Sequence, residues 1–135
     1  MHTKTFIGRY ENLARIEKFF AEAATKAGLD SASIYAVKLA VDEACTNIIE
    51  HAYGGEDRGK IQCSYEIMED GLRIILRDWG DSFDPSKVPE PDFSVPIEEL
   101  KPRGAGVFLM KKLMDEVQFD FTTEEANVLQ MVKRK

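Results

Sequence analysis

The sequence lacks a long apolar run and a basic stripe, and both absences narrow what the protein can be. No window approaches the roughly 18 consecutive apolar residues of a membrane-spanning helix, so we expect no membrane association. The net charge of −6, without a basic segment to track a phosphate backbone, argues against direct binding to nucleic acid. Internal repeats and low-complexity segments are also absent. With 135 residues, the chain has the size of a single domain, 1–135.

Cysteine is scarce, since only Cys45 and Cys63 occur. Each lies among apolar neighbours, so we expect buried free thiols. Two cysteines cannot supply the four ligands of a structural metal site, and His2 and His51 lack ligand spacing. Unpaired thiols are typical of a reducing compartment, and they predict a cytoplasmic protein.

Proline is absent outside one segment, because all five prolines fall between Pro85 and Pro102. Residues 80–103 around them show no apolar periodicity. So long a loop inside a compact domain is typical of a functional lid, and we expect it to close over a ligand.

Apolar spacing predicts the remaining elements. In chain order these are a strand at 3–9, a helix at 12–26, a helix after Asp30-Ser31 that ends before Tyr53, strands at 60–68 and 72–78, a helix at 107–114, and strands at 116–122 and 127–133. Gly71, in the turn between the two central strands, is expected where φ must be positive. Because the strands come mainly as hairpins, we expect an α/β two-layer sandwich with a mixed, mainly antiparallel sheet covered on one face by helices.

One apparent phosphate motif is rejected. Residues 54–61 read GGEDRGKI, which nearly spells a P-loop. However, Ile61 stands where that motif needs a hydroxyl for magnesium, and the segment leads into a strand rather than a helix.

The second expected helix carries Glu43 and Asn47, four residues apart and therefore on one face. They lie beyond the edge of the apolar stripe, together with Ala36 and Ala40, whose small side chains would leave room for a ligand. A carboxylate beside an amide suits a site where one group takes a proton and the other offers an oxygen to a hard cation. A solvated helix face would give the same pattern.

Asp78 ends an apolar strand, and Gly80 follows two residues later. A carboxylate at a strand end can accept a hydrogen bond from the exocyclic amine of adenine, and a residue without Cβ lets the flat base approach. An ordinary turn after a strand would also read Asp-x-Gly.

A third motif, RGAGV at 103–107, directly follows the proline-rich loop. Glycines at the start of a helix leave backbone N–H groups unpaired at the positive end of the helix dipole. Such a helix start binds anions, and its place after a lid-like loop favours the phosphates of a nucleotide.

The three segments, in this order and spacing, resemble the N, G1 and G2 boxes of the Bergerat-fold ATPases, which include DNA gyrase, the Hsp90 chaperones, sensor histidine kinases and mismatch-repair ATPases. Within that superfamily the chain resembles the bacterial anti-sigma-factor serine kinases. The segments that carry the similarity are EACTN at 43–47, HAY at 51–53, DWG at 78–80, FDP at 83–85 and LMDEV at 113–117. The similarity covers nearly the whole chain and implies the Bergerat ATP-binding fold.

This resemblance implies roles for the motif residues. Glu43 would be the general base and Asn47 the Mg²⁺ ligand, while Asp78 would bind the adenine amine, with Gly80 giving the base room. The implied phosphate-binding residues are Arg103, Gly104, Ala105, Gly106 and Val107. The implied cofactors are ATP and Mg²⁺.

The resemblance also implies an activity and partners. The family phosphorylates a serine of a small anti-anti-sigma protein and otherwise sequesters a sigma factor, and its members often form homodimers. We therefore expect a serine/threonine-protein kinase and anti-sigma factor that acts in transcription regulation and the stress response. The alternative is a non-catalytic, nucleotide-dependent switch that binds a partner. Glu43 favours the kinase, because a switch needs no base beside its metal ligand.

Two positions depart from the family pattern. Ser82 stands where the wider superfamily usually has another glycine in the G1 box, and Asn127-Val128 replaces a Gly-Thr pair in the last hairpin. Either Thr122 or Thr123 could supply the missing hydroxyl near adenine. These departures concern the adenine contacts more than the family.

Overall fold

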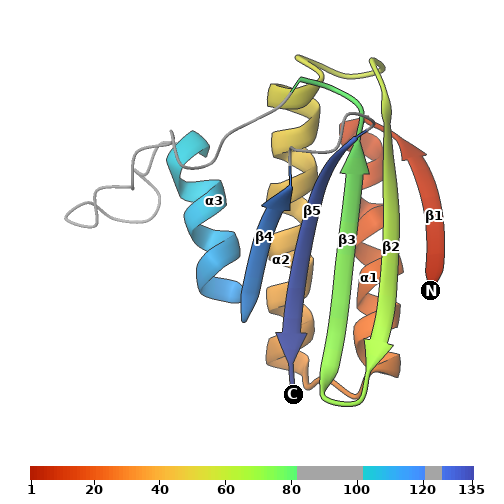
Figure 1. Cartoon of the computed structure of the whole chain (residues 1–135), viewed down its shortest axis with the longest axis vertical. Helices are drawn as coiled ribbons and strands as arrows, with labels where there is room; N and C mark the ends of the chain where they lie inside the picture. The colour runs from red at the N-terminus through yellow and green to blue at the C-terminus, as the bar shows by residue number, and fades with distance from the viewer. Residues whose placement is uncertain (82–101, 121–125) are drawn as a thin grey trace.

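The computed structural model describes residues 1–81, 102–120 and 126–135, with 102–106 described by their backbone alone. In these residues, five strands form one sheet in the order β1-β2-β3-β5-β4, and three α-helices cover one of its faces (Figure 1). The expected two-layer α/β sandwich is therefore confirmed. Most of the predicted lid at 80–103, namely residues 82–101 with Ser82, lies outside the described residues, as do Thr122 and Thr123.

The bounds of the elements lie close to those expected from apolar spacing. The strands are β1 (His2–Ile7), β2 (Lys60–Met68), β3 (Gly71–Asp78), β4 (Glu116–Asp120) and β5 (Asn127–Arg134). The helices are α1 (Leu13–Lys26), α2 (Ser31–Asn47) and α3 (Pro102–Leu113), with a 3-10 turn η1 (Tyr10–Asn12) before α1 and a π-helical turn η2 (Ile48–Ala52) after α2.

Helix α2 has a defined start and an unusual end. Asp30 caps the start, because its Oδ1 accepts a hydrogen bond from the Ser33 N–H at 2.8 Å. At the other end the helix widens into η2, where the Tyr53 N–H donates to the Ile48 carbonyl at 3.0 Å. Single π-helical turns are frequent at functional sites, and this one directly follows Asn47.

The sheet was expected to be mixed, but the four strand pairings in the described ranges are all antiparallel. The connection from β3 through α3 to β4 gives β3 and β4 the same direction, as a crossover does. Strand β5 then lies between them and runs opposite to both. The parallel relation therefore exists only between strands that are not neighbours.

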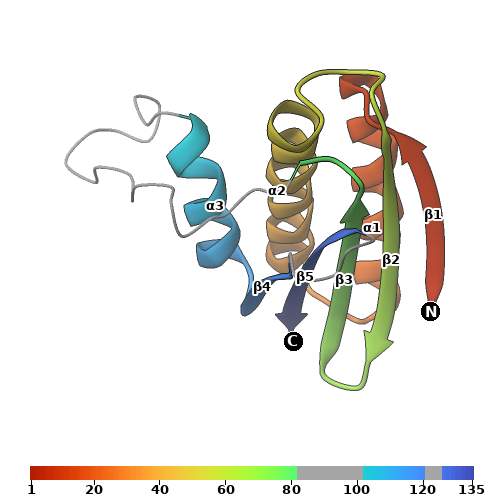
Figure 2. The same ribbon diagram turned by 45° about the horizontal axis from the view of Figure 1, so that its top comes forward.

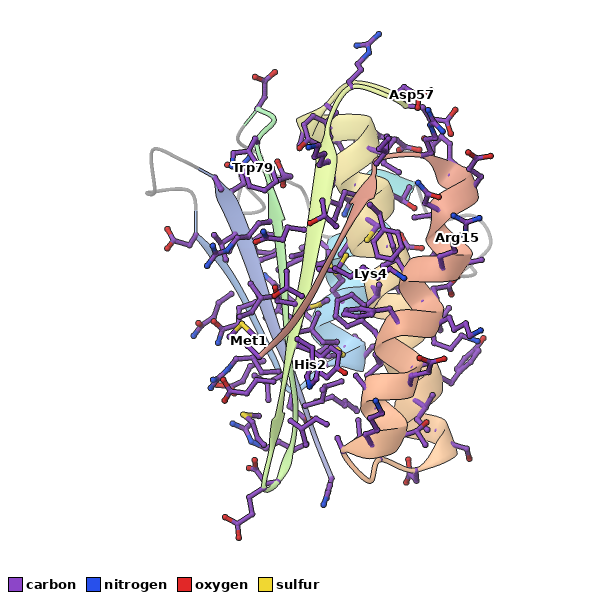
Figure 3. The ribbon with its side chains drawn as sticks, turned by 90° about the vertical axis from the view of Figure 1, so that its right-hand side faces the viewer. Met1, His2, Lys4, Arg15, Asp57 and Trp79 are labelled. Atoms are coloured by element: carbon purple, nitrogen blue, oxygen red, sulfur yellow. The ribbon has the colours of Figure 1, made fainter. Side chains whose placement is uncertain are left out.

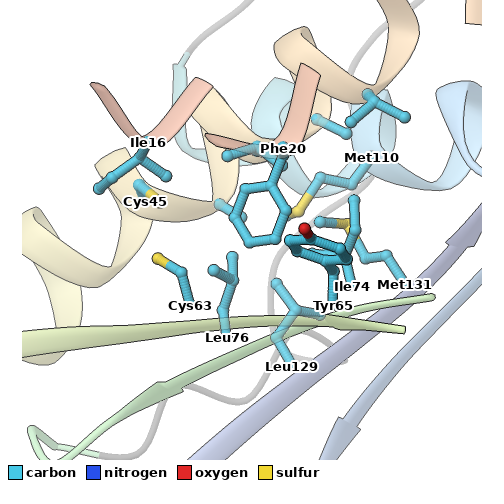
Figure 4. Close-up of a cluster of buried hydrophobic side chains, with 14 of the residues drawn as sticks. Ile16, Phe20, Cys45, Cys63, Tyr65, Ile74, Leu76, Met110, Leu129 and Met131 are labelled. Atoms are coloured by element: carbon cyan, nitrogen blue, oxygen red, sulfur yellow. The ribbon is translucent and has the colours of Figure 1, made fainter. Parts of the chain in front are cut away.

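The hydrophobic core lies between the sheet and the helices, and α2 packs between α1 and α3 (Figure 2). Phe20 of α1 and Ile74 of β3 are among its fully buried residues (Figure 4). Cys45 and Cys63 are also in this core, both as free thiols, as predicted. Burial raises the pKa of Cys63 to about 12. None of the helices in the described parts of the chain is long and apolar enough to cross a membrane.

Gly71 serves close packing rather than a positive φ. The glycines with positive φ in the described chain are Gly28, Gly54 and Gly55, so the expectation for Gly71 is wrong. A Cβ at Gly71 would lie 2.1 Å from the carbonyl oxygen of Lys133 and 2.8 Å from Cα of Arg134. The residue is glycine because the backbone of β5 occupies the space of a side chain.

We therefore expect Gly71→Ala to destabilise the fold by about 1–3 kcal/mol, the usual cost of forcing extra atoms into a packed site. Urea unfolding followed by circular dichroism measures the change. Glu69→Ala in the same turn is the matched control, with an expected change within about 0.5 kcal/mol. Equal stability of the two variants would contradict the close approach of β5.

Candidate functional site

The end of α2 and its turn η2 lie near the end of β3 and the start of β5 (Figure 1). Residues of these segments line a pocket. It encloses about 410 Å³ of empty space, part of which is open to solvent. Its walls include the apolar side chains of Met110, Phe119 and Leu129. Its polar residues are Asn47, Asp78, Asp81 and Asn127. A mainly apolar cleft with a few convergent polar groups is the usual form of a small-molecule site.

Asp78 is buried in this pocket at the end of β3. Its Oδ1 accepts hydrogen bonds from the Gly80 N–H at 3.0 Å and from Nδ2 of Asn127 at 2.9 Å. Burial raises the pKa of the Asp78 carboxyl, and these two bonds partly oppose the rise. Neither bond uses Oδ2, so that oxygen can accept from a ligand in the pocket.

Asn127 is a site residue whose role the sequence did not reveal. It is paired directly with Asp78 in the β3–β5 ladder, which brings its amide onto the carboxylate. The same Nδ2 lies 3.0 Å from the carbonyl oxygen of Gly80 and 3.3 Å from that of Asp81. The sequence signal was the replacement of the family's Gly-Thr pair by Asn127-Val128. Its meaning depends on a strand register that the sequence does not display.

Gly80 packs against the end of the π-helical turn. A Cβ at this position would lie 2.3 Å from the carbonyl oxygen of Ala52, and the Asp81 N–H donates to that same oxygen at 2.8 Å. The missing side chain is thus explained by helix packing, while the contact with adenine stays a prediction. Ala36 and Ala40 were expected to leave room for a ligand, but both are buried residues that do not line this pocket. The small residues that line the pocket are Ala44 and Ala52.

Asn47 lines the pocket and carries an unpaired buried atom. Its Nδ2 is shielded from solvent and has no hydrogen-bond partner within the described chain. Leaving such a group unpaired costs about 1–3 kcal/mol, which a bound ligand would offset. Because an amide can turn over and place its oxygen at the same point, Asn47 fits the role of a ligand to a hard cation.

The described residues contain no cluster of three or more His, Cys, Asp or Glu side chains that could hold a metal by itself. A Mg²⁺ ion at Asn47 would thus take its remaining ligands from phosphates and water. That is the usual way in which proteins hold magnesium beside a nucleotide.

Glu43 lies on α2 one turn before Asn47 and is half-buried, but it does not line the pocket. Burial raises the pKa of its carboxyl, and the nearby charges of Asp42 and Glu50 raise it further. A carboxylate with a raised pKa is a stronger proton acceptor near neutral pH. Glu43 thus lies one helical turn before the candidate magnesium ligand and outside the lining of the pocket that holds Asp78.

Helix α3 begins at Pro102, earlier than the predicted start at Val107. Proline suits the first helical position, because its missing N–H would have no partner there. Gly104, Ala105 and Gly106 consequently lie inside the first turns of the helix rather than before it. Only the first N–H groups of a helix stay without an intrahelical partner, and that of Gly106 is beyond them. Phosphate binding at 103–107 stays a prediction.

The comparisons with known proteins agree with this geometry. Residues 6–133 match the family of the histidine kinase-like ATPase domain. Serine-protein kinase RsbW of Bacillus cereus (strain AH187) is 41% identical over 112 residues, which are 80% of this chain and 69% of the relative. The protein of the same name from Bacillus anthracis (strain CDC 684 / NRRL 3495) is 40% identical over the same shares.

Two solved structures share the fold. One contains the RsbU and RsbW domains of a Mycobacterium tuberculosis protein, with a TM-score of 0.65 and 14% identity, over 99% of this chain and 32% of that one. The other is the catalytic domain of histidine kinase ThkA, with a TM-score of 0.59 and 18% identity, over 100% of this chain and 99% of that one. The chain belongs to the histidine kinase-like ATPase domain family and, within it, to the RsbW serine-protein kinases. The resemblance stated from the sequence is thereby confirmed.

The bond between Asn127 and Asp78 yields a prediction that needs no ligand. Asn127→Leu removes a hydrogen bond that favours the charged carboxylate, so the pKa of Asp78 should rise further. Stability should fall by about 1–3 kcal/mol, because a buried acceptor loses its donor. Carboxyl-carbon NMR titration measures the first effect and urea unfolding the second. Gln130→Leu on the same strand is the control, and an unchanged pKa of Asp78 in Asn127→Leu would contradict the assignment.

Proposed function

We propose that this protein is an ATP- and Mg²⁺-dependent serine-protein kinase that phosphorylates a serine of an anti-anti-sigma protein and otherwise holds a sigma factor. The observation that supports it most is the meeting of Asp78 and Asn47 in one pocket. One is a buried carboxylate with an oxygen left for a donor, and the other is an amide whose buried polar atom has no partner. Membership of the RsbW kinases adds the reaction class.

The adenine end of the site is assigned to Asp78. Its Oδ2 accepts a hydrogen bond from the exocyclic amine, while Asn127 and the Gly80 N–H hold Oδ1 in place. The apolar side chains of Met110 and Leu129 flank the base. Adenine is preferred over guanine because guanine presents an oxygen where adenine presents this amine, and two acceptors repel.

The phosphate end of the site is assigned to Asn47 and residues 103–107. The oxygen of Asn47 would hold Mg²⁺ together with the phosphates of ATP. When bound, Mg²⁺ neutralises phosphate charge and aligns the γ-phosphate. The resemblance implies that Gly104 and Gly106 bind the phosphates and that Arg103 adds positive charge there.

Glu43 is assigned the role of the general base that accepts the proton of the incoming serine hydroxyl. It lies one helical turn from Asn47, so a hydroxyl aimed at the γ-phosphate comes within its reach. Its raised pKa, caused first by burial, suits a group that must accept a proton near neutral pH. A partner-binding switch without catalysis would have no use for this arrangement.

The partners and the compartment follow from the family and the composition. The resemblance implies a sigma factor and an anti-anti-sigma protein as partner types, and it supports a homodimer as one possible assembly. The two buried free thiols support a reducing, cytoplasmic location.

Mg²⁺ and ATP together should raise the melting temperature. A ligand that binds only the folded state adds about 2.7 kcal/mol of stability at a concentration of 100 times its Kd. Asp78→Asn should remove most of this shift, because its NH₂ can face the adenine amine donor to donor. Asp70→Asn, in the exposed turn at the other end of β3, should keep it. A wild-type protein with no shift for any adenine nucleotide would contradict the nucleotide site.

The variant Glu43→Gln distinguishes the kinase hypothesis from the hypothesis of a non-catalytic switch. It should keep most of the nucleotide affinity and lower phosphoryl transfer by roughly 100- to 10,000-fold, the usual contribution of a positioned general base. Asn47→Ala should weaken both binding and transfer, because it removes a Mg²⁺ ligand.

The assay uses labelled ATP and an anti-anti-sigma protein as the substrate, with the phosphoserine located by mass spectrometry. Glu22→Gln on the exposed face of α1 is the matched control and should behave as wild type. A wild-type protein that transfers no phosphate, yet binds a sigma factor in a nucleotide-dependent way, would establish the switch instead.

A further inference from the structure

Tyr53 joins three segments that are distant in the sequence. It follows η2 directly, and its hydroxyl oxygen lies 2.6 Å from the carbonyl oxygen of Lys60 and 2.9 Å from the backbone nitrogen of Trp79. A phenol has one hydrogen, so it donates to Lys60 and accepts from the Trp79 N–H. The end of the α2–η2 helix is thereby tied to the start of β2 and to the turn after β3.

That turn is the one that carries the adenine candidate, since Trp79 lies between Asp78 and Gly80 (Figure 3). The same turn meets the helix end at Ala52, through the Asp81 N–H and the close approach of Gly80. The helix that ends there also carries Asn47. The relative position of Asp78 and Asn47 therefore depends on how this turn is held against the helix end.

The ring of Tyr53 is held in place by close packing against two glycines. A Cβ on Gly59 would lie 2.1 Å from this ring, and a Cβ on Gly8 would lie 3.8 Å from it. Burial raises the pKa of the hydroxyl, and the charge of Asp78 raises it as well. The hydroxyl thus contacts the backbone of the residue that follows Asp78, although Tyr53 does not line the pocket.

We propose that Tyr53 is a positioning residue, whose hydroxyl holds Asp78 at the correct distance from Asn47 and so sets the affinity for adenine without touching the nucleotide. This inference rests on the proposed adenine contact of Asp78. Loss of the hydroxyl leaves the Trp79 N–H without this acceptor and lets the Asp78 turn move. The phosphate end of the site keeps its own residues and should be unaffected.

The test compares Tyr53→Phe with Tyr10→Phe in the full chain. Tyr10 is a matched control, because its hydroxyl also makes a long-range hydrogen bond, to Oε1 of Glu50 at 2.9 Å, but does not contact the Asp78 turn. Tyr53→Phe should weaken Mg²⁺–ATP binding roughly five- to tenfold, which corresponds to the loss of one or two net hydrogen bonds. Binding of Mg²⁺–tripolyphosphate, which lacks adenine, should change less than twofold. Tyr10→Phe should leave both affinities as in wild type.

A second readout is the fluorescence of Trp79, which is the sole tryptophan of the chain and is half-exposed. Without any ligand, Tyr53→Phe should change its emission and Tyr10→Phe should not. The positioning role would be overturned if Tyr53→Phe lost ATP and tripolyphosphate affinity equally, or if it bound ATP as well as Tyr10→Phe does. In either case, ATP binding by the wild-type protein would still uphold the nucleotide site. Wild-type protein that binds no ATP would overturn both.

If Tyr53→Phe does not fold, Gly59→Ala provides the same test with the hydroxyl retained, because the added methyl displaces the ring. It should show the same selective loss of ATP binding over tripolyphosphate binding. If Gly59→Ala shifted the Trp79 emission but left ATP binding unchanged, the inference would be overturned.

Discussion

The pairing of β5 with β3 is the constraint on which the site depends. Asp78 and Asn127 form the last pair of this ladder, so the carboxylate receives its amide donor through strand register. A slip by one residue would turn Asn127 to the other face of the sheet and leave Asp78 buried without that bond. The ladder that places β5 inside the sheet thus also supplies the hydrogen bond that favours the charged form of the Asp78 carboxylate.

The polar groups of the candidate site, in and beside the pocket, destabilise the fold when no ligand is bound. Asn47 keeps a buried atom unpaired, and burial disfavours the charged forms of Asp78 and Glu43. Two acidic neighbours, Asp42 and Glu50, increase the effect on Glu43. Such costs gather at functional sites, because a ligand with an amine donor and a cation can relieve them. The chemistry of ATP with Mg²⁺ matches what these groups lack.

Local patterns predicted most of the fold, and non-local contacts account for what they missed. The bounds of β2 and the start of α2 at Asp30 follow from apolar alternation and a capping side chain. The bond between Asn127 and Asp78 joins residues 49 positions apart, through strands whose adjacency no local pattern reveals. The reason for Gly71 lies in β5, even farther along the chain. The early start of α3 was missed because glycines contribute no apolar period.

The π-helical turn η2 lets this part of the chain change length by one residue without turning Tyr53 away from β3. A π turn holds one residue more than the α turn it replaces. Loss of a single residue between Ile48 and Ala52 would restore the α-helical path, because the Tyr53 N–H would then meet the Ile48 carbonyl four positions back instead of five. The carbonyl of Ala52 and the ring of Tyr53 would still face the turn after β3. Among related chains, this segment should therefore tolerate the loss of one residue.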